Sequence, residues 1–462
     1  MNLFGTDGIR GIANAGLSWH TAFKLGRAMG LYLSQGLPLC VGKDTRASGD
    51  MLEACIIAGA TSAGRDVVRL GVITTPGLSY LVKHLGLGGG VMISASHNPA
   101  EYNGLKVFGG DGKKIPDSME VLFSEFIQNE SESGIATGGE GTAPGVVASC
   151  AYPTGSGIGR VIPGEGYVDK YVDFLCSVPA NRLSDFRVVL DTANGSTSEI
   201  ASRVWSRLGA RVEVINNSPD GININADCGS TCPGNLAAKV VNSGADAGFA
   251  YDGDGDRCIM VDETGTVQDG DHTMAILALD LVKKGRLPGR TVVGTVMSNY
   301  GLEVCLADHD LRLERTPVGD RYVLEKMEEQ GYNLGGEQSG HIIVKDVLGA
   351  GDGILTSLMV ADVLAGSGKK LSELSSVMTA IPQHLVNVRA DNPKGLAARE
   401  AVIDAVKKAQ AELGDRGRVL VRPSGTEPLV RIMVESLDSH MVESCIHYLE
   451  EVIAKENQVG KE

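Results

Sequence analysis

Three segments of the chain follow one plan, in which an apolar strand, a polar or glycine-rich loop, an amphipathic helix and a second strand come in succession. They cover residues 37–73, 186–215 and 291–336. In the second segment, Ile200, Val204 and Leu208 recur at helical spacing between valine-rich strands. A strand, a helix and a strand of this length pair in parallel through a right-handed crossover. The repetition predicts three similar α/β domains.

The remainder of the chain, from about Leu371, has a different order of elements. A strand "HLVNVRA", a helix over 393–413, two strands "GRVLVRP" and "LVRIMVE" and a last helix predict a small α+β domain. The segment 131–166 is rich in glycine, which is typical of a linker or an irregular loop. A chain of 462 residues also exceeds what one hydrophobic core organises. The predicted domains are 1–150, 166–263, 264–369 and 370–462.

The overall charge limits the classes of partner. A formal net charge of -15 opposes binding to nucleic acid or to an anionic membrane. The sequence has no 18-residue apolar stretch and no signal-peptide pattern at its start, and its nine scattered cysteines fit a reducing compartment. We therefore expect a cytoplasmic monomer or homodimer that acts on a small molecule.

The strongest local pattern is "YDGDGDRCIMVD", in which Asp252, Asp254 and Asp256 alternate with glycine. Three carboxylates this close repel one another unless a cation lies between them. An EF-hand is disfavoured because Arg257 stands where that loop needs glycine and because "CIMVD" looks like a strand. A solvated acidic turn is the other alternative. The pattern predicts a Mg²⁺ site whose coordination a phosphate completes.

A second pattern, "RPSGTEPLVR", combines two arginines, two hydroxyls and a glycine. Arginine donates bidentate hydrogen bonds to phosphate, and glycine frees backbone amides for the same purpose. The pattern favours an anion-binding loop over a β-turn with surface arginines. Its candidate residues are Arg422, Ser424, Gly425, Thr426 and Arg431.

Two further patterns are weaker when taken alone. In "LGGEQSGHII", Glu337, Ser339 and His341 follow two glycines, which suits either the hydroxyls of a sugar or a turn with a core histidine. In "FGTDGIRG", Arg10 follows two glycines, and a surface turn is the simplest interpretation.

Ser96 lies in "GVMISASHNP", where an apolar strand ends. It has no evident charge-relay partner, because His97 is its neighbour and no GxSxG turn surrounds it. A serine that carries a phosphoryl group needs instead a divalent cation and cationic side chains. The other patterns predict both.

Taken in order, "FGTDGIRG", "ISASHNP", "DGDGDR", "GGEQSGH" and "RPSGTEP" resemble the α-D-phosphohexomutase family over essentially the whole chain. The resemblance implies three similar α/β domains with mixed sheets and a C-terminal α+β domain, arranged around a central cleft. It implies that Ser96 is the phosphoserine donor. It also implies one Mg²⁺ per chain, held by Ser96, Asp252, Asp254 and Asp256.

The same resemblance assigns the other candidate residues. Glu337 and Ser339 would bind sugar hydroxyls, and a clamp for the non-reacting phosphate would consist of Arg422, Ser424, Gly425, Thr426 and Arg431. Residues expected near the reacting phosphoryl group are Arg10, Lys106, Arg257 and His341. Lys106 and His341 are both candidates for general acid and general base.

Within the family, "TPVGDRYV", "GEQSGH" and "PDGININADCGSTCPGNL" are most similar to the branch that acts on glucosamine phosphate. This implies an isomerase that interconverts glucosamine 6-phosphate and glucosamine 1-phosphate through a 1,6-bisphosphate, with glucose or glucosamine 1,6-bisphosphate as a candidate activator. Residues 100–102 and Cys232 depart from that branch. The same reaction on mannose or glucose phosphates, a Mg²⁺-dependent phosphatase and a non-catalytic sugar-phosphate sensor are the alternatives.

Overall fold

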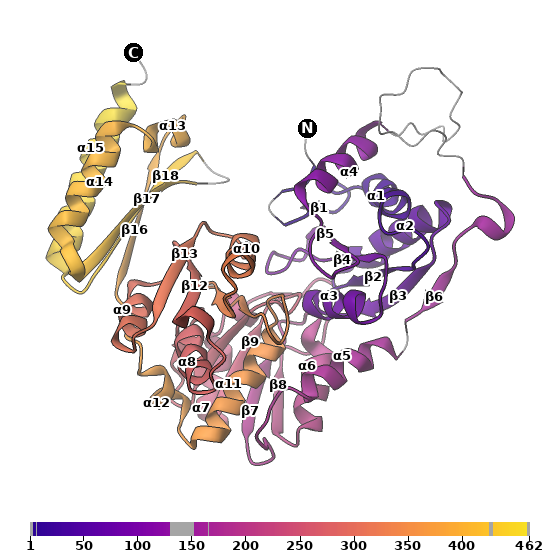
Figure 1. The fold of residues 1–462 in the computed structure, drawn as a ribbon, viewed down its shortest axis with the longest axis horizontal. Coiled ribbons are helices and arrows are strands. Elements are labelled where there is room, and N and C mark those ends of the chain that lie inside the picture. Colours follow the sequence, from indigo (N-terminus) through magenta and orange to yellow (C-terminus); the bar gives the residue numbers. More distant parts are fainter. Residues whose placement is uncertain (1–2, 6, 130–151, 165, 425–427, 460–462) are drawn as a thin grey trace.

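The computed structural model describes residues 3–5, 7–129, 152–164, 166–424 and 428–459. Its strands form sheets of six, five, four and three strands that follow one another along the chain (Figure 1). The fourth sheet and its helices stand at one end of the molecule, apart from the first sheet (Figure 1). The predicted fold class, three α/β domains with mixed sheets and a C-terminal α+β domain, is confirmed.

The first sheet is mixed. In spatial order the strands are β1 (Ile9–Ile12), β5 (Tyr102–Gly109), β4 (Gly89–Ile93), β2 (Leu39–Lys43), β3 (Val67–Val72) and β6 (Val161–Pro163). Strands β2, β3, β4 and β6 run in parallel, whereas β5 is antiparallel to both β4 and β1.

Helices cover both faces of this sheet. Val41, Val91 and Val107 point into a core with α1 (Trp19–Tyr32), α2 (Ser48–Ser62) and α4 (Asp117–Asn129). Cys40 and Met92, which are the sequence neighbours of Val41 and Val91, point to the other face of the sheet. The helix α3 (Thr75–His84) covers that face. The strand β6 lies beyond the boundary expected at residue 150, because the chain returns to pair with β3 before it enters the second domain. A short 3-10 helix, η1 (Gly155–Gly157), precedes it.

The second sheet has the order β11 (Val267–Gln268), β10 (Cys258–Asp262), β9 (Ala247–Tyr251), β7 (Arg187–Asp191) and β8 (Arg211–Ile215). Its strands β8, β7 and β9, of which β8 is at the edge, are parallel, as the strand–helix–strand pattern predicts. Its helical elements are α5 (Tyr167–Cys176), α6 (Thr197–Arg207), η2 (Gly229–Thr231) and α7 (Gly234–Ser243). Val189 and Ala250 face α7, whereas Leu190 and Phe249 face Trp205 of α6.

The third sheet has the order β13 (Arg312–Thr316), β12 (Thr291–Thr295), β14 (Leu334–Gly336) and β15 (Ile342–Val344), with β15 antiparallel. Val293 and Ile343 pack with Val323 and Met327 of the helix α10 (Asp320–Gln330). The helical elements of this part of the chain are α8 (Gly270–Lys283), η3 (Pro288–Arg290), α9 (Tyr300–Asp308), α10 (Asp320–Gln330), α11 (Gly353–Ser367) and α12 (Leu371–Ser375).

Helix α11 joins the second and third domains. It follows the third sheet in sequence, yet it contacts β9, β10 and α5 of the second domain as well as α8. Leu355, Leu358 and Val360 are buried in one continuous core that extends from the α3 face of the first sheet through the second sheet to the third. The two domains therefore share a core, although their sheets are separate.

The fourth domain is an antiparallel sheet with helices on one face. Its strands have the order β16 (Gln383–Arg389), β18 (Leu429–Ser436) and β17 (Gly417–Pro423). Val419, Ile432 and Val434 belong to a core of their own with the helices α13 (Pro393–Ala397), α14 (Glu400–Leu413) and α15 (Ser439–Val459). The helix predicted over 393–413 is therefore two helices, and a 3-10 turn, η4 (Gly414–Arg416), follows them.

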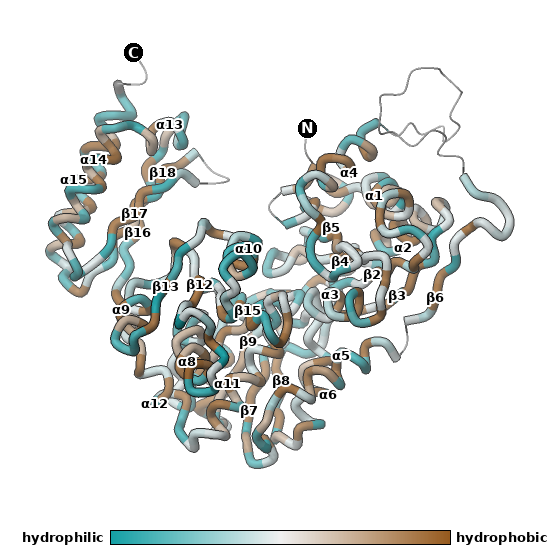
Figure 2. The backbone as a smooth tube through the Cα atoms, in the orientation of Figure 1, coloured by the Kyte–Doolittle hydropathy of each residue, from teal (hydrophilic) through white to brown (hydrophobic). Residues whose placement is uncertain are grey.

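Figure 2 shows hydrophobic residues concentrated in the strands and in the helices that lie against them. In the part of the chain that the structure describes, no helix is both long and apolar enough to cross a membrane.

Candidate functional site

Ser96 lies in the loop between β4 and β5 and is 2% exposed. Its φ is 54°, in the left-handed region that a non-glycine residue rarely adopts. Its backbone N–H donates to Ser94 Oγ at 2.9 Å, and that hydroxyl donates to Asp44 Oδ2 at 2.6 Å. These bonds hold the strained turn, and such strain is typical of functional loops.

Arg46 and Asn225 hold the carbonyl groups of the same loop. Arg46 Nη2 donates to Ser96 O at 2.9 Å and to Asn98 O at 2.8 Å, and Asn225 Nδ2 donates to Ser96 O at 2.9 Å. The Arg46 guanidinium is fully buried and pairs with Asp44 at 2.9 Å. The sequence analysis did not single out these residues. For Asp44 and Arg46 the available signal is the "DTR" run that follows β2, because polar residues at the end of parallel strands gather at one sheet edge.

The three aspartates follow β9 and converge on one point. Their ligand oxygens all lie within 4.8 Å of one another. Ser96 Oγ donates to Asp252 Oδ2 at 2.6 Å, so the expected phosphate carrier touches the carboxylate cluster. A Cβ on Gly253 would lie 2.6 Å from Ser96 O, which shows why this position is glycine.

The cluster has the properties of a cation site. The Oδ1 atoms of Asp254 and Asp256 are buried and have no hydrogen-bond partner among the described residues. Burial and the charges of Asp256 and Asp254 raise the pKa of Asp252 well above its ordinary value. A divalent cation would relieve this repulsion and use the free oxygens, so the residues present fit Mg²⁺. The chain continues into β10, which confirms the predicted strand and excludes an EF-hand helix at that position.

Lys106 lies on β5 beside the cluster. Its Nζ is 2.8 Å from Asp254 Oδ2 and 3.0 Å from Asp7 Oδ2, and its side chain is 1% exposed. Burial alone would lower the pKa of Lys106, but the charges of Asp254 and Asp7 outweigh it and raise the pKa. Asp7 also pairs with Arg10. Asp7 was not among the predicted site residues, although it stands three residues before Arg10 in "FGTDGIRG".

Glu337, Ser339 and His341 occupy the turn between β14 and β15. Glu337 Oε1 accepts a hydrogen bond from Gly319 N at 3.1 Å, which fixes one carboxylate oxygen. Ser339 Oγ and His341 Nδ1 are buried without a hydrogen-bond partner among the described residues. An isolated antiparallel bridge between Arg257 and His341 joins this turn to the aspartate loop. The structure thus brings together the patterns around Asp252 and Glu337.

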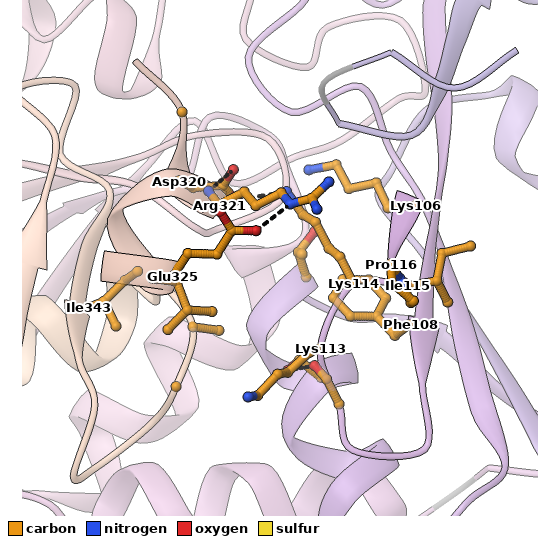
Figure 3. A pocket seen from close by; sticks show the side chains of 18 of the residues that line it. Lys106, Phe108, Lys113, Lys114, Ile115, Pro116, Asp320, Arg321, Glu325 and Ile343 are labelled. Carbon is orange, nitrogen blue, oxygen red and sulfur yellow. Dashed lines mark hydrogen bonds and ion pairs between the residues drawn. The ribbon is translucent and has the colours of Figure 1, made fainter. Parts of the chain in front are cut away.

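A cavity of about 580 Å³ opens over these groups. Its lining includes the expected site residues Arg10, Ser96, Asp256, Arg257, Glu337 and His341. A second cavity of about 610 Å³ adjoins it, lies between the first and third domains, and shares Asp256, Asp320 and His341 with the first (Figure 3). The smaller cavity is therefore the candidate substrate site.

The expected phosphate clamp lies in the fourth domain. Arg422 and Arg431 are direct partners across β17 and β18, and Ser424 N donates to Leu429 O at 2.8 Å. Burial and the charge of Arg431 lower the pKa of Arg422. These three residues do not line either of the two cavities, and Gly425 and Thr426 lie outside the described residues. The two arginines nevertheless lie side by side on the open face of the sheet, so they could bind one anion together.

Models of four protein domains match the chain. They are described as Phosphoglucomutase/phosphomannomutase, alpha/beta/alpha domain I over residues 1–133, domain II over 165–265 and domain III over 269–381, and the C-terminal domain over 385–452.

Curated relatives match over nearly the full length. A phosphoglucosamine mutase from Clostridium novyi is 45% identical over 98% of both chains. One from Caldicellulosiruptor saccharolyticus is 48% identical over 94% of this chain and 95% of its own.

Solved structures share the fold. A phosphoglucomutase/phosphomannomutase family protein from Burkholderia thailandensis has a TM-score of 0.79 at 22% identity and covers 98% of this chain and 97% of its own. An Aspergillus fumigatus N-acetylphosphoglucosamine mutase in complex with GlcNAc-6P and magnesium has a TM-score of 0.63 at 16% identity, covering 98% of this chain and 96% of its own.

Proposed function

Because the chain belongs to the phosphoglucomutase/phosphomannomutase family, we propose that it is a phosphohexomutase that interconverts glucosamine 6-phosphate and glucosamine 1-phosphate. The hydrogen bond of 2.6 Å from Ser96 Oγ to Asp252 Oδ2 is the observation that carries the proposal. It joins the phosphate-carrying serine to the group of carboxylates that fits a cation. The names of the full-length relatives support glucosamine over mannose and glucose phosphates.

In the forward reaction, phosphorylated Ser96 transfers its phosphoryl group to the free hydroxyl of the bound sugar phosphate. The bond between Ser96 Oγ and phosphorus breaks and a bond from the sugar oxygen to phosphorus forms. The sugar hydroxyl gives its proton to a general base, and Ser96 Oγ takes up a proton from a general acid. The product is a 1,6-bisphosphate. After it turns over in the site, its other phosphoryl group returns to Ser96 and releases the isomeric monophosphate.

The residues around Ser96 supply positive charge to this transfer. Asp252, Asp254 and Asp256 would hold Mg²⁺ together with an oxygen of the phosphoserine, and the ion would neutralise charge on the transferring group. Lys106 and Arg257 would act beside it, and Arg10 lines the same cavity. Fixed cations in a buried site stabilise a phosphoryl transition state because they need no reorganisation.

The two candidates for proton transfer differ in their surroundings. Carboxylates surround Lys106 and raise its pKa, which supports a role as a permanent cation, because an ammonium group with a raised pKa gives up its proton less readily. His341 has a buried Nδ1 with no hydrogen-bond partner among the described residues, which supports a role as the base. Glu337 and Ser339 would bind ring hydroxyls in both orientations of the sugar.

The clamp on the fourth domain would bind the phosphate that is not reacting. Arg422 and Arg431 can each donate two hydrogen bonds to a phosphate, whichever carbon of the sugar carries it. Recognition of the phosphate alone would allow both substrate orientations with similar energy.

The decisive experiment is intact-mass measurement of the purified protein and of the Ser96→Ala variant, combined with turnover. We expect one phosphate on part of the wild-type protein, none at this position in the variant, and mutase activity in the wild type alone. A variant with full activity would exclude the phosphoserine mechanism.

Rates on glucosamine, mannose and glucose 6-phosphates, measured side by side with added glucose 1,6-bisphosphate, test the substrate. Preference for glucosamine 6-phosphate is expected. Release of inorganic phosphate in place of the isomer would identify a phosphatase.

A further inference from the structure

A line of alternating charges connects the aspartate loop of the second domain to the third domain by way of the first. The side chains, in order, are Asp254, Lys106, Asp7, Lys114 and Asp320. The successive N–O distances are 2.8, 3.0, 2.5 and 2.7 Å. Each cation thus lies between two carboxylates that belong to different parts of the chain.

Lys114 is the member of this line that joins the first and third domains. Its backbone is fixed by an isolated bridge to Phe108 of β5, and its Nζ lies between Asp7 Oδ1 and Asp320 Oδ2. The exposed fractions of the Lys114, Asp7 and Asp320 side chains are 26%, 23% and 29%, so all three are largely shielded from water. Burial lowers the pKa of Lys114, but the charges of Asp320 and Asp7 outweigh it and raise the pKa.

Both ends of the Lys114 contact reach residues of the proposed site. Asp7 pairs with Lys106 and Arg10, beside the reacting phosphoryl group. Asp320 is the first residue of α10, and the preceding Gly319 donates its N–H to Glu337 Oε1 at 3.1 Å. Lys114 therefore connects the residues proposed to transfer phosphate with the residues proposed to bind the sugar.

Neighbouring ion pairs across the same boundary lack these connections. Lys113 Nζ lies 2.5 Å from Glu328 Oε1, and these side chains are 46% and 40% exposed. Figure 3 shows Lys106, Lys114 and Asp320 close together at the cavity, with Lys113 apart from them. Exposed pairs of this kind contribute little, because water screens both charges. Lys113 is thus a matched control for Lys114.

We propose that Lys114 is a positioning residue that holds the two sides of the site together through Asp7 and Asp320, and so retains the bisphosphate intermediate while it turns over. The inference rests on the proposed function, since only a mutase must keep a doubly phosphorylated intermediate between two transfers. An intermediate that escapes leaves Ser96 without its phosphate. The enzyme then needs bisphosphate from solution before it can work again.

The test measures the concentration of added glucose 1,6-bisphosphate that gives half-maximal mutase activity. For Lys114→Met we expect this concentration to rise about tenfold, because the variant loses a shielded ion pair. We expect kcat at saturating bisphosphate to stay within about threefold of wild type. Lys113→Met should match wild type, and Lys114→Arg should restore most of the loss, because arginine can still pair with both carboxylates. An equal bisphosphate requirement in Lys114→Met and Lys113→Met would overturn the proposal.

Two further measurements keep the result interpretable. If Lys114→Met does not fold, Asp320→Asn breaks the same tie from the other side, and an unchanged bisphosphate requirement in that variant overturns the proposal. Hydrogen exchange of residues 319–341 tests the connection through Lys114 without a measurement of catalysis, and we expect faster exchange in Lys114→Met than in Lys113→Met. If the wild type shows no mutase activity, the proposed function fails. Equal exchange in the two variants would refute the positioning role of Lys114.

Discussion

Arg418 and Glu435 are direct partners across β17 and β18, and both also contact the segment that follows β12. Arg418 Nη2 lies 2.6 Å from Glu435 Oε2, and Arg418 Nη1 donates to Val296 O at 3.0 Å. Glu435 Oε1 accepts from Tyr300 N at 3.3 Å. The same two strands carry the Arg422–Arg431 pair four residues further along. The residues that attach the fourth domain and the proposed phosphate clamp thus share one sheet face.

Glu435→Gln should weaken binding of the substrate phosphate more than it slows chemistry. The change removes the charge that holds Arg418, so the clamp loses its fixed position relative to the third domain. We expect KM to rise about tenfold while kcat stays within about threefold. Glu456→Gln is the control, because Glu456 pairs with Arg399 inside the fourth domain. An unchanged KM in Glu435→Gln would refute the role of this attachment.

Arg46→Met should reduce both stability and phosphorylation of Ser96. The variant leaves the buried Asp44 carboxylate unpaired, which costs about 3–5 kcal/mol, and it frees the carbonyls of Ser96 and Asn98. Urea unfolding and intact mass measure the two effects. Arg65→Met is a matched control, because Arg65 is also buried and donates to carbonyls, such as Leu33 O, away from the site. Similar loss of phosphate in both variants would mean that Arg46 acts only on stability.

Asp352 should make the stability of the protein depend on pH. It is the N-cap of α11 and accepts from Tyr171 Oη at 2.6 Å and from Leu355 N at 3.0 Å. Burial raises its pKa from 3.8 to about 6. Between these two pH values the folded state therefore holds a proton that the unfolded state releases. The resulting contribution to the free energy of unfolding is complete below pH 3.8 and is lost as the pH rises through about 6.

The Asp352→Asn variant tests this pH dependence, because asparagine caps a helix about as well as aspartate but does not ionise. Between pH 4 and pH 7 the wild type should lose stability that the variant keeps. We therefore expect the difference in the free energy of unfolding, variant minus wild type, to increase over this range by up to about 3 kcal/mol. Parallel pH profiles for the two proteins in urea unfolding would contradict the assignment.

Asp256→Asn should raise the Mg²⁺ concentration needed for half-maximal activity by about tenfold or more, because it removes one anionic ligand. Asp256 tests the metal more cleanly than Asp254, which also holds Lys106 and accepts a hydrogen bond from Thr75. Asp262→Asn is the control, since Asp262 accepts hydrogen bonds from Thr264 and Gln268 beyond the cluster. A normal Mg²⁺ dependence in Asp256→Asn would remove this residue from the site.

The sequence analysis predicted the elements that local pattern determines. The strand after Asp256 and the three α/β units are examples, because hydrophobic periodicity and glycine turns encode them locally. It also selected Ser96, Asp252 and Glu337, and the structure brings their loops to adjoining positions.

Contacts between distant segments could not be predicted in this way. Arg46, Asp7 and Lys114 are ordinary charged residues in the sequence, and their roles depend on carbonyls and carboxylates from other loops. The apolar composition of α11 predicts burial, but it does not say that the second sheet is among its neighbours. Similarly, the three residues of β6 carry too weak a pattern to reveal their pairing with β3.

The shared position of α11 determines which parts of the protein can exist alone. A chain cut after the second sheet would expose the faces of β9 and β10 that α11 covers, and these faces would invite aggregation. The fourth domain has a separate core and joins the rest through a few polar contacts. The fourth domain could therefore be removed without opening the core of the others, whereas the second domain, the third domain and the α3 face of the first share one core and should unfold together.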